Sequence, residues 1–188
     1  MKRTALVAAV LLVCAAAFST AQKQCQQLLV SIKPEIDIPL PPDPNLFQIG
    51  GGTAVSASYV FPFFRPLSAG ILVNYHLGRL QHEDPGIHGS LSLISAEAII
   101  GLRLTLWQLI DAYLSGGAGY FFTFVNEEPS SWATNIVLSG GMGIGLRVNP
   151  TLTVGIQGEY RRYRSLYHLI GVGLGADLRL GSVEGKAE

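Results

Sequence analysis

The feature that most constrains this chain is a two-residue alternation of side-chain character that recurs from residue 47 to residue 180. In segment 134–148, the even-numbered positions are mainly apolar, and the odd-numbered positions other than Val137 hold Gly, Ser, Asn and Arg. Successive side chains of a β-strand point to opposite faces, so this pattern predicts strands that each present one apolar face. Seven segments share it: 47–61, 68–80, 90–104, 112–124, 134–148, 152–161 and 171–180.

An eighth strand is expected before the first of these, over 27–38. Single-chain bacterial barrels of antiparallel strands have even strand numbers and carry both termini on one side. Pro34 lies inside this segment, and proline is tolerated best near a strand edge or at a bulge. Short turns at 62–67, 105–110 and 149–150 then alternate with more polar connections at 39–46, 81–88, 125–133 and 164–167.

The apolar face of these strands is expected to contact lipid. Charged residues make up 14% of the chain, against ~25% in ordinary soluble domains. No lysine occurs between Lys33 and Lys186, although soluble β-proteins commonly place lysine on exposed edges. The predicted fold class is therefore all-β, a closed antiparallel up-and-down transmembrane β-barrel of eight strands. The residues expected to face lipid are Ile71, Val73, Ile100, Leu138, Ile144, Val154, Ile156, Val172 and Leu174.

The opposite face carries acids and arginines together and is expected to line the lumen. An enclosed ion-pair network suits this mixture better than an open surface does. The network could be a selectivity lining or a proton path, or it could fill and rigidify a barrel barely wide enough for its own side chains. Inward glycines on the last four strands could leave a void, so a narrow channel remains an alternative function. The predicted lumen charges are Glu97, Arg103, Arg147, Glu159, Arg161, Asp177 and Arg179, with Asn74 and His76 as structural neighbours.

The first 21 residues have the pattern of a cleaved export signal. Lys2 and Arg3 precede an apolar core that ends in small residues at Ala21. A lipidated N-terminus at Cys14 is the alternative. We expect a signal peptide at 1–21, an N-terminal segment with the candidate first strand and a Pro-rich loop at 22–46, the barrel at 47–181, and a short polar tail at 182–188.

Several motifs that suggest chemistry are better explained as barrel features. The stretch GVGLGADLRL contains the spacing of a dinucleotide-binding loop at Gly171, Gly173 and Ala176. That loop needs a following helix and an acid about 20 residues later, whereas here the two-residue alternation continues to the end of the stretch. The formal net charge of +0 provides no basic field for nucleic acid. We expect no nucleic-acid partner and no cofactor.

Two further features, a loop with metal-capable side chains and a His–Ser pair, also suggest chemistry. Pro85 and Gly86 interrupt the group His82, Glu83, Asp84 and His88, and they forbid the helix that a H-E-x-x-H zinc site needs. His88 and Ser90 superficially resemble the pair of outer-membrane lipid deacylases, but the surrounding residues of that family are missing. We therefore expect no metal site, no catalytic residue and no enzymatic activity.

The export signal, the alternating strands and the terminal segment resemble the small eight-stranded outer-membrane proteins of the OmpA, OmpX and OmpW type, over roughly 27–181. In that family the last strand carries an assembly signal, Gly-x-x-apolar-x-apolar, which Gly175, Leu178 and Leu180 match. The family usually ends at a terminal aromatic residue, whereas this chain continues from Gly181 to Glu188. The resemblance implies export to the bacterial outer membrane, contact with outer-membrane lipids and assembly by the barrel-insertion machinery.

The function expected from the sequence is that of an integral outer-membrane barrel with a structural or surface-interaction role, in which the loops meet a host or surface ligand. One alternative is a narrow channel for small or hydrophobic solutes. Another is an exported soluble or lipid-anchored barrel that binds an apolar ligand inside, with the two faces exchanged.

Overall fold

The computed structural model describes residues 27–40, 48–62, 64–79, 89–106, 108–125, 131–164 and 167–181. Eight antiparallel strands account for nearly all of these residues. They are β1 (Gln27–Leu40), β2 (Gly50–Val60), β3 (Leu67–Arg79), β4 (Ser90–Leu106), β5 (Ile110–Val125), β6 (Ser131–Arg147), β7 (Leu152–Tyr163) and β8 (Tyr167–Leu180).

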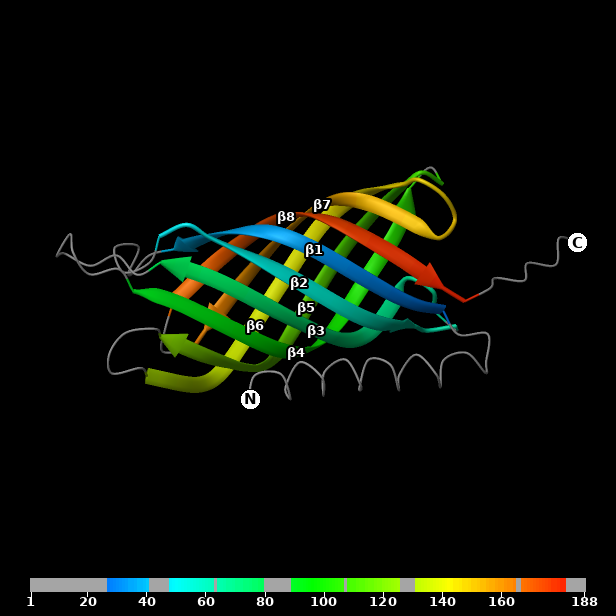
Figure 1. Cartoon of the computed structure of the whole chain (residues 1–188). Coiled ribbons are helices and arrows are strands. Elements are labelled where there is room, and N and C mark those ends of the chain that lie inside the picture. Colours follow the sequence, from blue (N-terminus) through cyan, green and yellow to red (C-terminus); the bar gives the residue numbers. More distant parts are fainter. Residues whose placement is uncertain are drawn as a thin grey trace, which may run out of the picture.

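The strands form a closed barrel in sequence order, with β8 hydrogen-bonded back to β1 (Figure 1). Leu28 pairs with Leu180 at the closure, so the described chain begins and ends at the same end of the barrel. We call this the turn end, because the short connections after β2, β4 and β6 lie there, and we call the opposite end the loop end. The predicted closed eight-stranded barrel is confirmed. The described residues include no helix of the length and apolarity that a membrane span requires.

Strand β1 supplies the eighth strand that the even strand number required, so the barrel begins at Gln27. Pro34 lies at neither an edge nor a bulge, because the register with β2 runs unbroken through the pair Pro34–Thr53. On the other side, the ladder with β8 stops at Ile32 and resumes at Glu35 in the same register. Proline has no N–H group to donate, and the barrel accommodates it by omitting ladder pairs on one side only.

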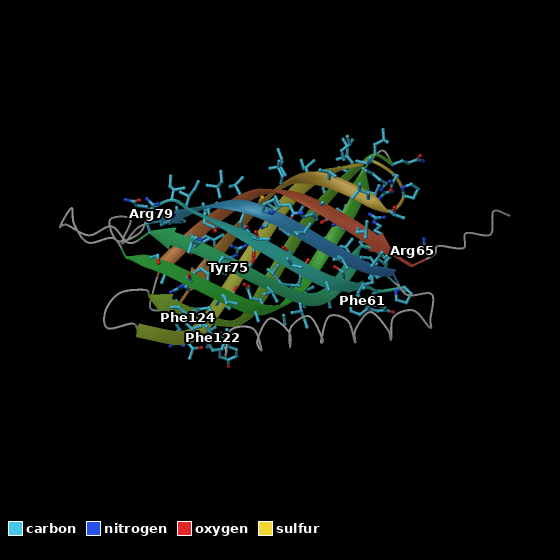
Figure 2. All side chains as sticks on the ribbon, viewed as in Figure 1. Phe61, Arg65, Tyr75, Arg79, Phe122 and Phe124 are labelled. Carbon is cyan, nitrogen blue, oxygen red and sulfur yellow. The ribbon has the colours of Figure 1, made fainter. Side chains whose placement is uncertain are left out.

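The outer face of the barrel is apolar along most of its length. The predicted outward residues have exposed fractions between 41% and 64%, except Val73, which is half-buried. Aromatic side chains lie toward both ends of the wall: Phe61 is near Arg65 at the turn end, while Tyr75, Phe122 and Phe124 lie toward the loop end (Figure 2). The exposed members of the predicted set are Ile71, Ile100, Leu138, Ile144, Val154, Ile156, Val172 and Leu174.

At the loop end, three strands exchange the character of their two faces. On β4, Leu91 and Leu93 point inward and are 1% and 0% exposed, so Ser90 and Ser92 point outward. On β7 and β8, Arg162 and His168 point outward, whereas the next residues, Tyr163 and Leu169, are buried. The inward side chains form an apolar lumen cluster that fills this end of the barrel: Leu91, Leu93, Phe121, Val137, Tyr163 and Leu169.

The outer wall generates a depth-dependent prediction. Ile156→Arg should lower the free energy of unfolding in lipid vesicles by about 2–4 kcal/mol if this position lies near the bilayer midplane. Thr134→Arg is the matched control, because Thr134 also points outward but lies near the loop end of β6, where the cost should be about 0–1 kcal/mol. Denaturant titration of both variants measures the difference. Equal costs at the two positions would contradict a lipid-facing wall.

Candidate functional site: the barrel lumen

The inward residues of β4 show how the lumen is layered. From the loop end to the turn end, they pass through the apolar pair Leu91 and Leu93, the polar pair Ser95 and Glu97, and a less polar stretch at 99–101. The strand then reaches Arg103 and Thr105 at the turn end. The other strands add to the same layers, so the described lumen contains an apolar cluster, a central polar cluster, a cavity and a second polar cluster in that order.

Arg161 on β7 organises the central cluster and is 0% exposed. Its Nη1 atom donates to Glu35 Oε1 at 2.5 Å, and its Nη2 atom donates to Glu35 Oε2 at 3.0 Å. Its Nε and Nη2 atoms donate to the two carboxylate oxygens of Glu159, at 3.1 and 2.9 Å. Nη2 also donates to Asn74 Oδ1 at 2.9 Å. The planar guanidinium thus joins β1, β3 and β7 across the lumen, a task that suits its fixed fork of donors.

The remaining members of the central cluster surround this guanidinium. Lys33 Nζ lies 2.8 Å from Glu159 Oε2 and 3.0 Å from Glu35 Oε2. His76 Nδ1 lies 2.6 Å from Asp37 Oδ2. Ser95, Glu97 and Asn74 form a hydrogen-bonded group, in which Asn74 Nδ2 donates to Glu97 Oε1 at 3.0 Å. The central cluster is therefore Lys33, Glu35, Asp37, Asn74, His76, Ser95, Glu97, Glu159 and Arg161.

The second cluster lies near the turn end and is centred on Asp111 of β5, which is 0% exposed. Its carboxylate accepts a hydrogen bond from Arg147 and one from Arg179, each at 2.8 Å. Thr105 and Thr153 donate to the same carboxylate at 2.7 and 3.1 Å. Arg103 bridges from Asp111 to Asp177 on β8. The turn-end cluster is therefore Arg103, Thr105, Asp111, Arg147, Thr153, Asp177 and Arg179.

The two clusters have opposite formal charge. The central cluster contains four carboxylates and two permanent cations, whereas the turn-end cluster contains three arginines and two carboxylates. The arginines of the turn-end cluster are also more exposed: the exposed fractions of their side chains are 16–26%, whereas that of Arg161 is 0%. The lumen thus presents a basic mouth at the turn end and an acidic, closed interior.

A cavity of about 90 Å³ separates the two clusters. Lys33 and Glu159 line it from the central cluster, and Arg103 and Asp177 line it from the turn-end cluster. Much of the wall between them consists of hydroxyl groups, which can bind ordered water. A polar site of this size holds a few water molecules. The serines that line the cavity are Ser31, Ser56, Ser58, Ser68, Ser115 and Ser139.

Inward glycines of the last strands make room for long side chains from the neighbouring strands. A Cβ atom on Gly171 would lie 2.8 Å from Glu35 Oε2 and 2.9 Å from Asp37 Oδ1, and one on Gly143 would overlap the Tyr113 ring. A Cβ atom on Gly175 would overlap the Gln157 amide in the same way. The expectation of a void at these glycines is wrong, because side chains of the adjacent strands occupy the space. The cavity lies at the serines instead.

The structure brings the predicted lumen charges into the two clusters. Glu97, Glu159 and Arg161 belong to the central cluster, and the other four belong to the turn-end cluster. Sequence reasoning missed four buried charges, although three of them repeat every second residue between isoleucines and a proline in β1. The fourth lies just before the segment predicted to start at residue 112. The missed residues are Lys33, Glu35, Asp37 and Asp111.

The residues of the predicted assembly signal belong to neither lumen cluster. In the segment that matches the assembly signal, Gly175 is buried in the lumen wall, Leu178 is exposed and Leu180 is half-buried. His82, Glu83, Asp84 and His88 lie outside the described residues. Within the described part of the chain, no group of three or more His, Cys, Asp or Glu side chains is arranged to hold a metal ion.

Comparison with known proteins identifies the fold. No protein-family model matches the sequence, and no curated protein matches it. Among solved structures, the attachment invasion locus protein Ail of Yersinia pestis is 17% identical, with a TM-score of 0.55, covering 84% of this chain and 100% of that chain.

Two further solved structures agree. Neisserial surface protein A is 17% identical, with a TM-score of 0.54, covering 85% of this chain and 98% of that chain. The outer membrane protein OprG of Pseudomonas aeruginosa is 9% identical, with a TM-score of 0.53 and the same coverage. At these identities the likeness concerns the fold, which is that of small outer-membrane β-barrels.

The enclosure of Arg161 generates a stability prediction. Arg161→Met should lower the free energy of unfolding by about 3–5 kcal/mol, because Glu35 and Glu159 would remain buried without their shared guanidinium. Arg162→Met is the matched control: it removes the same side chain one residue later, where it points outward and is exposed. Denaturant unfolding in the same lipid measures both. A loss in Arg161→Met no greater than that in the control would contradict the role of the central cluster.

Proposed function

We propose that this protein is an integral outer-membrane β-barrel without catalytic activity, whose lumen is filled and whose functional contacts are made by its exterior and its surface loops. The observation that carries the proposal is the outer wall, where Ile100, Ile144 and Leu174 are 62–64% exposed. Exposed apolar side chains surround the barrel, far beyond the few hundred Å² of contiguous apolar patch on ordinary soluble proteins. Lipid is the solvent that suits such a wall, so the predicted lipid-facing residues would contact the bilayer directly.

The filling of the lumen supports a structural rather than a conducting role. Arg161 is bound on several sides by Glu35, Glu159 and Asn74, which leaves no water-filled passage along its layer. Toward the loop end, the apolar lumen cluster adds a second barrier, because its six side chains are at most 1% exposed. An eight-stranded barrel is wide enough only for such packing. The predicted lumen charges would thus stiffen the barrel.

The loops are the proposed site of surface interaction. Ail of Yersinia pestis has been solved in complex with the heparin analogue sucrose octasulfate, a polyanion. The loop-end connections of this chain, at 41–49, 80–89, 126–130 and 164–166, contain one arginine, Arg164, and five acidic residues: Asp43, Glu83, Asp84, Glu127 and Glu128. Like charges repel, so a sulfated polyanion suits these loops poorly. A cationic surface partner is the ligand class that their charge favours.

A narrow channel is the second candidate, and the serine-lined cavity is the observation that favours it. The cavity adjoins the more exposed turn-end cluster, so small solutes could enter from that end. Conduction would further require the central cluster and the apolar lumen cluster to open. The structure offers no second packing for either, so we place the channel below the structural role.

Planar-bilayer recording separates the two candidates. The purified protein should show no steady conductance above that of the bare lipid at 100 mV, because its lumen is closed in two layers. A sixteen-stranded porin inserted by the same procedure is the positive control, since its lumen is an aqueous channel. Reproducible conductance steps from the purified barrel would contradict the structural role and establish the channel.

A further inference from the structure

The outer wall carries charge at only a few places within the described strands. The outward-pointing arginines and histidines of these strands are Arg79, Arg162 and His168, and all three lie at the loop end. Figure 2 shows Arg79 at this end, beyond Tyr75 on the same strand. No acidic side chain of the described strands points outward, because each of them lies in one of the two lumen clusters. The loop-end rim is thus basic without a neighbouring acid on its own face.

Two of these bases lie side by side. Arg162 on β7 and His168 on β8 are direct cross-strand partners on the outer face. Side chains at such positions have Cβ atoms about 4.5–5.5 Å apart, so the guanidinium and the imidazole can reach one ligand together. The Tyr160 hydroxyl bonds His168 Nδ1 and holds the ring in place. We call Tyr160, Arg162 and His168 the rim patch.

The position of the rim patch along the barrel is defined by the exchange of face character. One step toward the turn end, the outward cross-strand pair is Tyr160 with Ile170, an aromatic and an apolar residue. The inward residues that flank the patch along the two strands, Tyr163 and Leu169, belong to the apolar lumen cluster, so at this level the apolar character has passed from the outer face to the lumen. The rim patch therefore lies where a wall suited to lipid becomes a wall suited to water, which is the level of lipid headgroups.

From this juxtaposition of Arg162 and His168 at the boundary of the apolar wall, we propose that the rim patch binds the phosphomonoester of a membrane lipid. Arginine forms paired hydrogen bonds with phosphate oxygens. When the Tyr160 hydroxyl donates to Nδ1, the neutral imidazole keeps its proton on Nε2 and offers it as a second donor. The acyl chains of the same lipid would lie along Ile170, Val172 and Leu174 of β8, which continue the outer face toward the turn end.

This inference rests on the proposed membrane location and is tested on the full mature chain in nonionic detergent micelles. Native mass spectrometry measures the affinity for three lipids with the same acyl chains: phosphatidate with a phosphomonoester, phosphatidylglycerol with a phosphodiester, and diacylglycerol with no phosphate. We expect the affinity to be highest for phosphatidate, lower for phosphatidylglycerol and lowest for diacylglycerol. Inorganic phosphate at millimolar concentration should not displace phosphatidate, because it lacks the acyl chains.

The double substitution Arg162→Gln with His168→Gln should weaken phosphatidate binding about tenfold and leave diacylglycerol binding unchanged. Arg65→Gln is the matched control, because Arg65 is an exposed arginine at the turn end (Figure 2). Arg79 of β3 has Ser90 rather than a histidine as its cross-strand partner. Arg79→Gln should therefore weaken phosphatidate binding less than the double substitution does. Equal losses in the Arg65 variant and the double variant would show general charge attraction and overturn the site.

Two outcomes keep this test apart from that of membrane location. A wild-type chain that folds as an aqueous monomer and does not enter micelles refutes the proposed function. A wild-type chain that enters micelles as a folded barrel, yet binds diacylglycerol as strongly as phosphatidate, refutes the rim patch alone. That second outcome is measured on the wild-type chain alone, so the inference can be refuted even if the double variant misfolds.

Discussion

Closure of the strand ladder between β1 and β8 is the constraint on which the rest of the structure depends. Backbone N–H and C=O groups in a hydrocarbon solvent must be paired within the protein, and an open sheet leaves two unpaired edges. The pairs from Leu28–Leu180 to Leu40–His168 remove those edges. Even Pro34, which has no N–H group to donate, stays within the sheet, because its register pairing with Thr53 of β2 is unbroken. With the edges removed, the apolar wall can face lipid along its whole circumference.

Closure with eight strands also determines what the lumen can contain. The interior is too narrow for a wide aqueous channel, and large side chains must therefore meet there. Burying charges costs free energy unless each charge is paired, and the two clusters provide those pairs through Arg161 and Asp111. Glycines such as Gly171 are the complement of this filling, because they leave the space that Glu35 and Asp37 occupy. The stretch GVGLG is thus a lumen wall shaped for charged side chains.

The sequence predicted the fold class because two-residue alternation has a single structural meaning over so many segments. It also predicted the seven lumen charges as one set, whereas the structure divides them into two clusters with a cavity between them. Lys33, Glu35 and Asp37 were missed although they alternate with apolar neighbours, since Pro34 weakened the interpretation of their segment as a strand. The partners of each charge were beyond prediction, because they depend on the register and stagger of strands far apart in the sequence.

The apolar lumen cluster was missed for a different reason. The sequence interpretation gave each strand one parity for lipid and one for the lumen, but the structure exchanges the character of the two faces near the loop end. Leu91 and Leu93 are apolar, so the pattern predicts that they point outward, whereas in the structure they point into the lumen. This exchange marks the end of the apolar outer wall, and it explains why a barrel with an apolar exterior also has a small apolar core at one end.

The central claim is that the solvent of the outer wall is lipid. The most direct measurement compares the protein in aqueous buffer, in detergent and in lipid vesicles, by circular dichroism and by gel migration with and without boiling. The account predicts β-structure and a boiling-dependent shift in migration only in detergent or lipid, with aggregation in buffer. A folded, monodisperse protein in aqueous buffer would contradict it, and would mean that the exposed apolar wall is covered in some other way.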